Sequence, residues 1–303
     1  MSYKVKFDFV RIRRKPFLIS AIITIAGIVA LLAFGLNYGV DFTSGTRMDI
    51  SVGTTITKEE AEAAFLEAGL ELPPELTIGG DNDRVSVRFD KVLAEDERTG
   101  LIGVFESKYG EQVAYEENTV DAGMAKELGR KAIFAVAMAS LGIALYVSIR
   151  FEWRFALSAL IALLHGAFVV VSIFSIFRLE VNLTFVAAIL TIIGYAINDT
   201  IVTFDRIREN LKTANIRRFD DLAELVNESL WQTLTRSINT AATVLFAALA
   251  LFIFGSESLR MFSLAMVIGL TAGAYSSVFI ASQVWLEIKA KSLKPGSADP
   301  KSA

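Results

Sequence analysis

The 303-residue sequence contains no cysteine and a single histidine, His165. Disulfide bonds, thiol catalysis and thiolate metal sites are therefore excluded. The sequence also lacks a glycine-rich phosphate-binding loop, a cluster of metal-ligating residues, and a serine placed beside a base. These absences predict a protein that is not an enzyme and that needs no metal or other cofactor. We also expect no nucleic-acid partner.

Apolar residues, in contrast, are abundant. They make up 53% of the chain, and the mean hydropathy is +0.49. A helix needs about 20 apolar residues to cross the hydrocarbon core of a bilayer. The sequence therefore predicts an α-helical membrane protein with six transmembrane helices. The six stretches that approach this length are Phe17–Leu36, Ala132–Ile149, Phe155–Phe177, Leu183–Phe204, Ile238–Phe254 and Met261–Val284.

Charge distribution predicts how these helices are oriented. Cytoplasmic flanks of membrane helices carry an excess of lysine and arginine. Basic residues gather before the first stretch, between the second and third, between the fourth and fifth, and after the sixth. Residues 41–126 instead contain 19 acidic and 8 basic residues. We therefore expect a cytoplasmic N-terminus with the first helix (1–40), an extracytoplasmic domain (41–126), five more helices (127–288) and a cytoplasmic tail (289–303).

Two polar segments carry secondary-structure patterns of their own. The order of strand-like and helix-like segments in residues 41–126 is β-α-β-β-α-β, which is typical of a small α+β ferredoxin-like domain. Near 219–236, apolar residues recur on one helical face. This pattern predicts a cytoplasmic amphipathic helix that lies along the membrane or packs under the helix bundle.

Asp199 is the most informative single residue, because it lies inside the fourth apolar stretch. It follows Leu183 by sixteen residues, about 24 Å along a helix. A carboxylate at such a depth costs on the order of 2–3 kcal/mol to insert and usually faces a partner or a water-filled path. The alternative is that the helix ends earlier and leaves Asp199 at the interface with water. Apolar residues continue to Phe204, which favours the buried position.

Arg236 is the predicted partner of Asp199. It precedes the fifth apolar stretch, on the side of the membrane where the fourth stretch ends, so the two side chains could meet. Alternatively, Arg236 is a flanking residue whose side chain extends to the lipid headgroups. Neighbouring polar residues favour an internal proton or ion path between two polar helix faces. These residues are Asn198, Thr200 and Thr203 beside Asp199, and Asn239, Thr240 and Thr243 beside Arg236.

Other candidate residues carry weaker signals. His165 lies near the middle of the third stretch and is explained by a hydrogen bond inside the bundle, or by a proton relay. Gly269 and Gly273 form a G-x-x-x-G pair, which predicts a close helix crossing. An intramembrane hydrolase would need a serine in a nucleophile elbow, and none of Ser172, Ser175 and Ser263 lies in such a context.

Three segments resemble a known family. "GVDFTSGT" follows the first stretch, "LTFVAAILTIIGYAINDTIVTFDRIREN" contains Asp199, and "LTRSINTAATVL" contains Arg236. Together with the order of spans and polar domain, they resemble the SecF family of the bacterial SecD–SecF protein translocase. The resemblance implies half of a resistance–nodulation–division (RND) transporter fold. It also implies a proton-coupling role for Asp199 and Arg236, and a loop motif at Asp41, Phe42 and Gly45, in which Ser44 replaces the first of two usual glycines.

The resemblance further implies a function and a set of partners. SecD would supply the other half of the transporter, and the pair would use the proton-motive force to help unfolded secretory proteins through the SecYEG channel in the cell inner membrane. SecA and YajC are further expected partners. Two alternatives are an RND-type transporter half acting on lipids or small molecules, and a scaffold subunit without proton coupling.

Overall fold

The computed structural model describes residues 7–73, 75–110 and 112–292. Within these residues, six helical segments are long and apolar enough to cross a membrane, which confirms the prediction of six candidate spans. Lys4, Lys6 and most of the predicted tail 289–303 lie outside the described residues. The spans are α1 Arg14–Phe34, α5 Ala122–Arg150, α6 Trp153–Ile176, α7 Leu183–Thr213, α8 Phe219–Phe254, and the run of α9 Glu257–Ser276, the π-helix η1 Ser277–Ala281 and α10 Ser282–Ala290.

Helix α8 differs from the prediction. The expected amphipathic helix near 219–236 and the fifth apolar stretch form one continuous helix of 36 residues. Residues 219–254 contain neither proline nor glycine, so nothing in the sequence interrupts the helix. The apolar face that predicts the amphipathic helix is present, because Leu222, Val226 and Leu230 are buried. It packs into the bundle as the first half of a long span.

The small domain lies between α1 and α5. Its elements follow the order β2 Gly45–Ser51, α3 Lys58–Glu67, β3 Glu75–Gly79, β4 Arg84–Phe89, α4 Glu95–Tyr109 and β5 Ala114–Val120. The four strands form one sheet in the order β3-β4-β2-β5, and every neighbouring pair is antiparallel. Strand β4 alternates buried and partly buried residues, as expected for a strand with one face on a core.

The core of the small domain is separate from the core of the membrane bundle. Its members come from the strands and from both helices, α3 and α4, so these helices cover the inner face of the sheet. Phe65 on α3 contacts Phe105 on α4 edge-on, with ring centroids 5.9 Å apart. The largest fully buried side chains of this core are Met48, Ile50, Ile56, Phe65, Leu93, Leu101 and Phe105.

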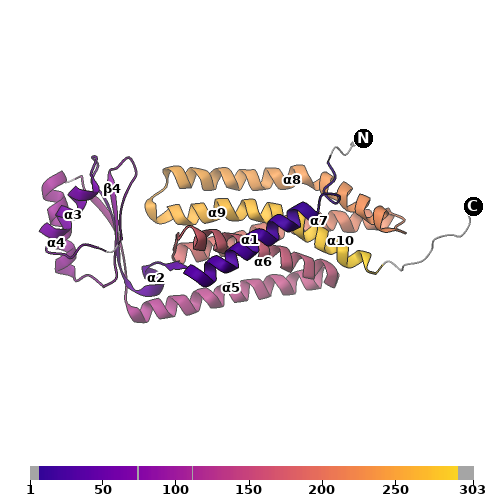
Figure 1. The fold of residues 1–303 in the computed structure, drawn as a ribbon, viewed down its shortest axis with the longest axis horizontal. Coiled ribbons are helices and arrows are strands. Elements are labelled where there is room, and N and C mark those ends of the chain that lie inside the picture. Colours follow the sequence, from indigo (N-terminus) through magenta and orange to yellow (C-terminus); the bar gives the residue numbers. More distant parts are fainter. Residues whose placement is uncertain (1–6, 74, 111, 293–303) are drawn as a thin grey trace, which may run out of the picture.

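Short elements join the small domain to the bundle. After α1, β1 Asn37–Tyr38 pairs in parallel with β6 Glu180–Val181, which lies between α6 and α7. The short helix α2 Val40–Thr43 follows and contacts α5. At the other end of the domain, β5 runs into α5 with only Asp121 between them; Asp121 accepts hydrogen bonds from the backbone N–H groups of Gly123 and Met124. Figure 1 shows the small domain at one end of the bundle.

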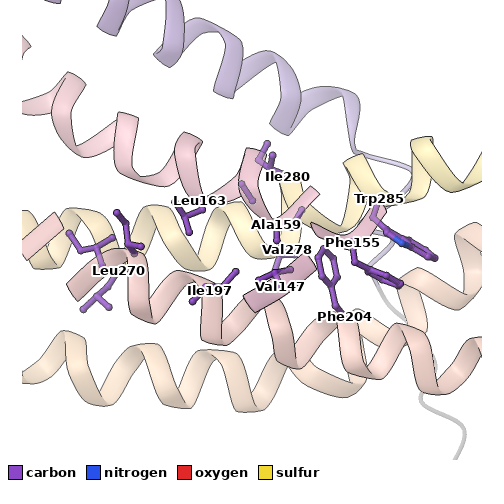
Figure 2. Close-up of a cluster of buried hydrophobic side chains, with 14 of the residues drawn as sticks. Val147, Phe155, Ala159, Leu163, Ile197, Phe204, Leu270, Val278, Ile280 and Trp285 are labelled. Carbon is purple, nitrogen blue, oxygen red and sulfur yellow. The ribbon is translucent and has the colours of Figure 1, made fainter. Parts of the chain in front are cut away.

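The bundle core is built around α6, α7 and the sixth span. In Figure 2, Phe155, Phe204 and Trp285 lie together near one end of this core. The rings of Phe155 and Trp285 are stacked with centroids 4.7 Å apart, and Phe204 lies 4.9 Å from Phe155. In contrast, the outward faces of α5 and α8 are mostly exposed in the isolated chain. The helix that carries Asp199 is therefore central in the bundle.

Candidate functional site

Asp199 lies inside α7, well within the continuous helix and not at its end. Its polar neighbours on other helices are the hydroxyl groups of Ser237 on α8 and Ser277 in η1. The Oδ2 atom of Asp199 is buried and has no hydrogen-bond partner. A buried carboxylate oxygen without a donor is costly as an anion, whereas a protonated carboxyl would supply a proton to a neighbouring acceptor. The position therefore favours a group that changes protonation.

A small cavity adjoins Asp199. Its volume is about 30 Å³, and its lining comes from α7, α8 and α9, including Tyr195, Asp199, Ser237 and Gly273. A cavity needs roughly 10–15 Å³ to hold one water molecule, so this space can hold one or two next to polar partners. The cavity is therefore large enough for a water molecule beside the carboxyl group.

Glycines on α9 allow the close approach that shapes this cavity. A Cβ atom on Gly273 would lie 3.2 Å from the Cβ of Ala196, and one on Gly269 would lie 2.2 Å from Cδ1 of Ile192. The close crossing predicted from the G-x-x-x-G pair is thus confirmed, and its partner is α7. The two helices approach each other next to the Asp199 site.

Hydroxyl groups surround Asp199 on the side of the sixth span. Thr200 lies 2.8 Å from Ser277, oxygen to oxygen, and it also donates to the carbonyl of Ala196. Ser277 is the first residue of the π-helix, whose wider turn is stabilised by a hydrogen bond from the Ser282 hydroxyl to the Ser277 carbonyl. Single-turn π-helices are frequent at functional sites. This one alters the helical register of the sixth span directly beside Asp199.

Arg236 does not make the predicted direct contact with Asp199. No ion pair within 4.0 Å joins the two in the described part of the chain, although Arg236 acts on the carboxylate electrostatically from farther away. Consecutive residues point in different directions on a helix, and on α8 it is Ser237 that faces α7. Arg236 is exposed on the outside of α8. Ser237, which no sequence pattern indicated, lies beside Asp199, where Arg236 was predicted to lie.

Asn198 and Asn239 are also exposed. Together with Arg236 and Thr240 they form a polar surface on the outside of α7 and α8, which we call the α7–α8 polar face. The polar residues of α7 and α8 therefore do not form single faces as predicted. Thr200, Thr203 and Ser237 turn inwards and are buried, whereas the residues of the α7–α8 polar face are exposed. Polar side chains at membrane depth usually face a partner or a water-filled space. The α7–α8 polar face thus exposes polar side chains on helices that are long and apolar enough to cross a membrane.

The single histidine and the membrane serines have structural partners. Nδ1 of His165 lies 2.8 Å from the hydroxyl of Ser276, which agrees with the expected hydrogen bond inside the bundle. The hydroxyls of Ser172, Ser175 and Ser263 each donate to a backbone carbonyl. None is paired with a base among the described residues. The arrangement therefore gives no support to a hydrolase, and no group of three potential metal ligands occurs in the described residues.

The loop motif after α1 occupies the junction with the small domain. Asp41 is buried, with 7% of its surface exposed. Its Oδ2 accepts from the backbone N–H of Leu183 at 2.6 Å, and its Oδ1 accepts from Asn118 at 2.8 Å. Phe42 meets Tyr38 edge-on, with ring centroids 6.1 Å apart. The motif therefore joins the segment after α1 to β5 of the small domain and to the start of α7.

Backbone geometry explains the small residues of this motif. Gly45 has φ of 132°, and a Cβ there would lie 2.2 Å from the backbone oxygen of Phe89. Ser44 has φ of 69° and ψ of 160°, a conformation that strongly favours glycine. Ser44 therefore occupies a strained position at which the family that the sequence resembles usually has glycine.

An ion pair at the same junction was not predicted. Arg47 on β2 donates a hydrogen bond to Glu180 on β6 and another to Asp49 at 3.2 Å. Burial raises the pKa of Glu180, and the charge of Arg47 opposes this rise. These residues are far apart in the sequence, so no local pattern could have identified the pair. Only the folded chain brings them together.

Comparisons with known proteins agree with this arrangement. The family model for the C-terminal part of the SecD/SecF protein export membrane proteins matches residues 103–291, and the SecD/SecF GG motif matches residues 29–56. The chain is 46% identical over 294 residues to protein translocase subunit SecDF of Bacillus subtilis, and it covers 40% of that relative. It is 43% identical over 303 residues to protein translocase subunit SecF of Alicyclobacillus acidocaldarius, of which it covers 98%.

A solved structure is similar as well. The crystal structure of a Thermus SecDF, described as a translocon-associated membrane protein, superimposes with a TM-score of 0.82 at 33% identity. The match covers 95% of this chain and 40% of the SecDF chain. The chain thus spans less than half of the SecDF proteins and nearly all of the SecF relative. It belongs to the SecD/SecF family of protein export membrane proteins.

Proposed function

We propose that the protein is one half of a SecD–SecF unit in the cell inner membrane, and that this unit uses the proton-motive force to assist Sec protein export. Its substrates are unfolded secretory proteins that pass through the SecYEG channel, and SecA and YajC are further candidate partners. The observation that carries the proposal is Asp199, a carboxyl group inside a central membrane helix with a water-sized cavity beside it.

The architecture proposed for this role is half of an RND-type transporter. Both termini lie in the cytoplasm, and the small domain lies outside the membrane. The split order of its strands, β3-β4-β2-β5, supports assignment to the ferredoxin-like class. The α7–α8 polar face is the surface at which a SecD half would complete the transporter. Neither half acts as an enzyme in this scheme.

The proposed mechanism follows the protonation of Asp199. As an anion, the carboxylate faces the hydroxyls of Ser237 and Ser277, which are groups that can donate hydrogen bonds to it. When a proton arrives through the cavity, the carboxyl loses its charge and gains a donor, so its preferred partners change. Ser277 begins the π-helix, and a local change there can alter the packing of the sixth span on α7. Moving one charge through 100 mV releases about 2.3 kcal/mol, a roughly fifty-fold bias between two conformations.

An export assay tests this proposal. The full-length chain is reconstituted with its SecD partner and the Sec channel in vesicles with an imposed proton gradient. Asp199→Asn should assemble normally but lose the gradient-dependent part of export, because asparagine cannot take up or release a proton. Arg236→Lys should also lose it, since lysine presents a different charge geometry at the α7–α8 polar face.

Asp205→Asn is the matched control. Asp205 lies on the same helix but is partly exposed and pairs with Arg208 at 2.8 Å. This variant should retain gradient-dependent export. Full export by Asp199→Asn would contradict proton coupling at this site and would favour a scaffold role.

A further inference from the structure

The junction between the small domain and the bundle contains two contacts that the mechanism above leaves unused. The first is made by Asp41, whose two carboxylate oxygens accept from different parts of the chain. One donor is the side chain of Asn118, on β5 of the small domain. The other is the backbone N–H of Leu183, the first residue of α7. Asp41 therefore connects the small domain directly to the helix that carries Asp199.

Physical chemistry favours a carboxylate at this place. The first N–H groups of a helix have no partner within the helix, and the helix dipole attracts negative charge there. Asn182, the N-cap of α7, accepts from Phe185 and leaves the N–H of Leu183 without an acceptor of its own. Asp41 supplies that acceptor from outside the helix. Because Asp41 is buried, water cannot readily replace it once it is removed.

The second contact is the ion pair between Arg47 on β2 and Glu180 on β6. Both side chains are 16% exposed, so the pair is shielded from water and salt. Gly39 makes room for it, because a Cβ atom there would lie 2.3 Å from Oε1 of Glu180. The N–H of Gly39 also donates to the carbonyl of Val181 at 2.9 Å. The strand pairing and the ion pair thus both fix the position of Glu180 and Val181.

Both contacts end on four consecutive residues, 180–183, that lead into α7. The small domain is also joined to α5 through Asp121 alone, without a flexible linker. A displacement of the start of α7 must therefore either move the small domain or break a buried hydrogen bond and an ion pair. Contacts between packed elements of this kind can carry coupling between distant sites.

We propose that Asp41 and the Arg47–Glu180 pair are positioning residues that couple the start of α7 to the small domain, so that a movement of the helix carrying Asp199 moves the small domain. This inference rests on the proposed proton coupling at Asp199. It assigns the loop motif after α1 a mechanical role: Asp41 transmits movement, Gly45 allows close approach to β4, and Phe42 packs at the base of α5. None of these residues is expected to bind the proton itself.

A distance measurement tests the proposal. Because the chain has no cysteine, Ser107→Cys on α4 and Phe177→Cys after α6 place two spin labels at exposed sites. The full chain in complex with its SecD partner is reconstituted, and the label-to-label distance is measured with Asp199 and with Asp199→Asn as the mimic of the protonated form. The expected result is a shift of the mean distance that disappears when Asp41→Ala is added.

Asp121→Ala is the matched control for Asp41→Ala. Asp121 also accepts backbone hydrogen bonds at a helix N-terminus, but both of its donors belong to α5. The control should remove a helix cap at the start of α5 and preserve the distance shift. Persistence of the shift in Asp41→Ala, or its loss in both variants, would overturn the proposal.

Two neutral substitutions provide an independent test of the second contact. Arg47→Met and Glu180→Gln should each reduce the shift, and the double variant should reduce it no further than the single variants, because each substitution removes the same ion pair. An undiminished shift in either single variant would overturn the role of this pair.

The export assay separates the two proposals. If Asp199→Asn abolishes gradient-dependent export but produces no distance shift, coupling through the junction is wrong while proton coupling stands. If export is unaffected by Asp199→Asn, the proposed function itself fails. In the expected case, Asp41→Ala lowers gradient-dependent export on the order of tenfold, a usual size for coupling between separate sites.

Discussion

The role of a single residue in this protein depends on its surroundings as much as on its own chemistry. Asp199 and Asp205 lie six positions apart on one helix, yet Asp199 faces hydroxyls and a small cavity, whereas Asp205 pairs with Arg208 and lies near Arg150. The same side chain is therefore a candidate proton carrier at one position and an ordinary surface ion at the other. The difference comes from burial and from which donors lie nearby.

Ser44 provides a prediction at this scale. Its φ of 69° and ψ of 160° place a side chain where the backbone favours glycine, at a cost of about 1–3 kcal/mol. Ser44→Gly should therefore raise the thermal midpoint of the purified protein. Gly45→Ala is the opposing control and should lower it, because the new Cβ would meet the backbone oxygen of Phe89. A lower midpoint for Ser44→Gly would show that the serine side chain stabilises the loop more than its backbone strain destabilises it.

At the scale of helices and strands, the two helices of the small domain begin in the same way. Glu60 accepts from the backbone N–H of Thr57 at 2.8 Å at the start of α3, and Glu97 accepts from Ala94 at 2.9 Å at the start of α4. The backbone hydrogen bond at Thr57 lowers the pKa of Glu60, and the side-chain hydrogen bond from Lys91 lowers the pKa of Glu97. Both helix starts thus depend on an ionised carboxylate.

This dependence predicts how the small domain responds to acid. A carboxyl group with a lowered folded-state pKa contributes stability above its unfolded pKa, near 4.5, and that stability is lost as the pH falls through the folded-state value. We expect the protection factors of the amides in α3 and α4 against hydrogen exchange to fall below pH 4.5 more than those in α6. The double variant Glu60→Gln, Glu97→Gln should show a weaker pH dependence. An unchanged pH profile in that variant would contradict the prediction.

On the scale of the whole molecule, two exposed surfaces differ in polarity. The outward face of α5 is apolar, with Leu141, Leu145 and Ile149 all more than half exposed. The α7–α8 polar face instead presents Asn198, Arg236 and Asn239. Lipid suits the first surface, and a protein partner with complementary polar groups suits the second. Under the proposed function, the α7–α8 polar face would be the side that meets the partner half, and the outward face of α5 would be the side that meets lipid.

This contrast predicts which substitutions disturb assembly. Asn239→Trp should weaken co-purification with the SecD partner, because a bulky side chain forced into a packed interface costs about 1–3 kcal/mol. Leu145→Trp on α5, a matched control at a lipid-facing position, should leave co-purification unchanged. Equal recovery of both variants would place the interface elsewhere on the molecule.

The sequence by itself was enough for the features that depend on local composition. Long apolar runs determine the six candidate spans, because a helix that crosses a membrane must be apolar along its length. Alternating and capped segments determine the order of elements in the small domain. The depth of Asp199 follows from counting residues along one helix. The resemblance to the SecF family also rests on contiguous motifs, and the comparisons confirm it.

The tertiary structure decided what depends on direction around a helix and on contacts between distant segments. It placed Ser237, and not Arg236, against Asp199, because a change of one position turns a side chain by about 100°. It joined the segment near 219–236 to the fifth span, because that segment contains no residue that ends a helix. It also brought Asp41 to Leu183 and Arg47 to Glu180. Residues more than 130 positions apart in sequence meet only when the chain folds, so no local pattern contains these contacts.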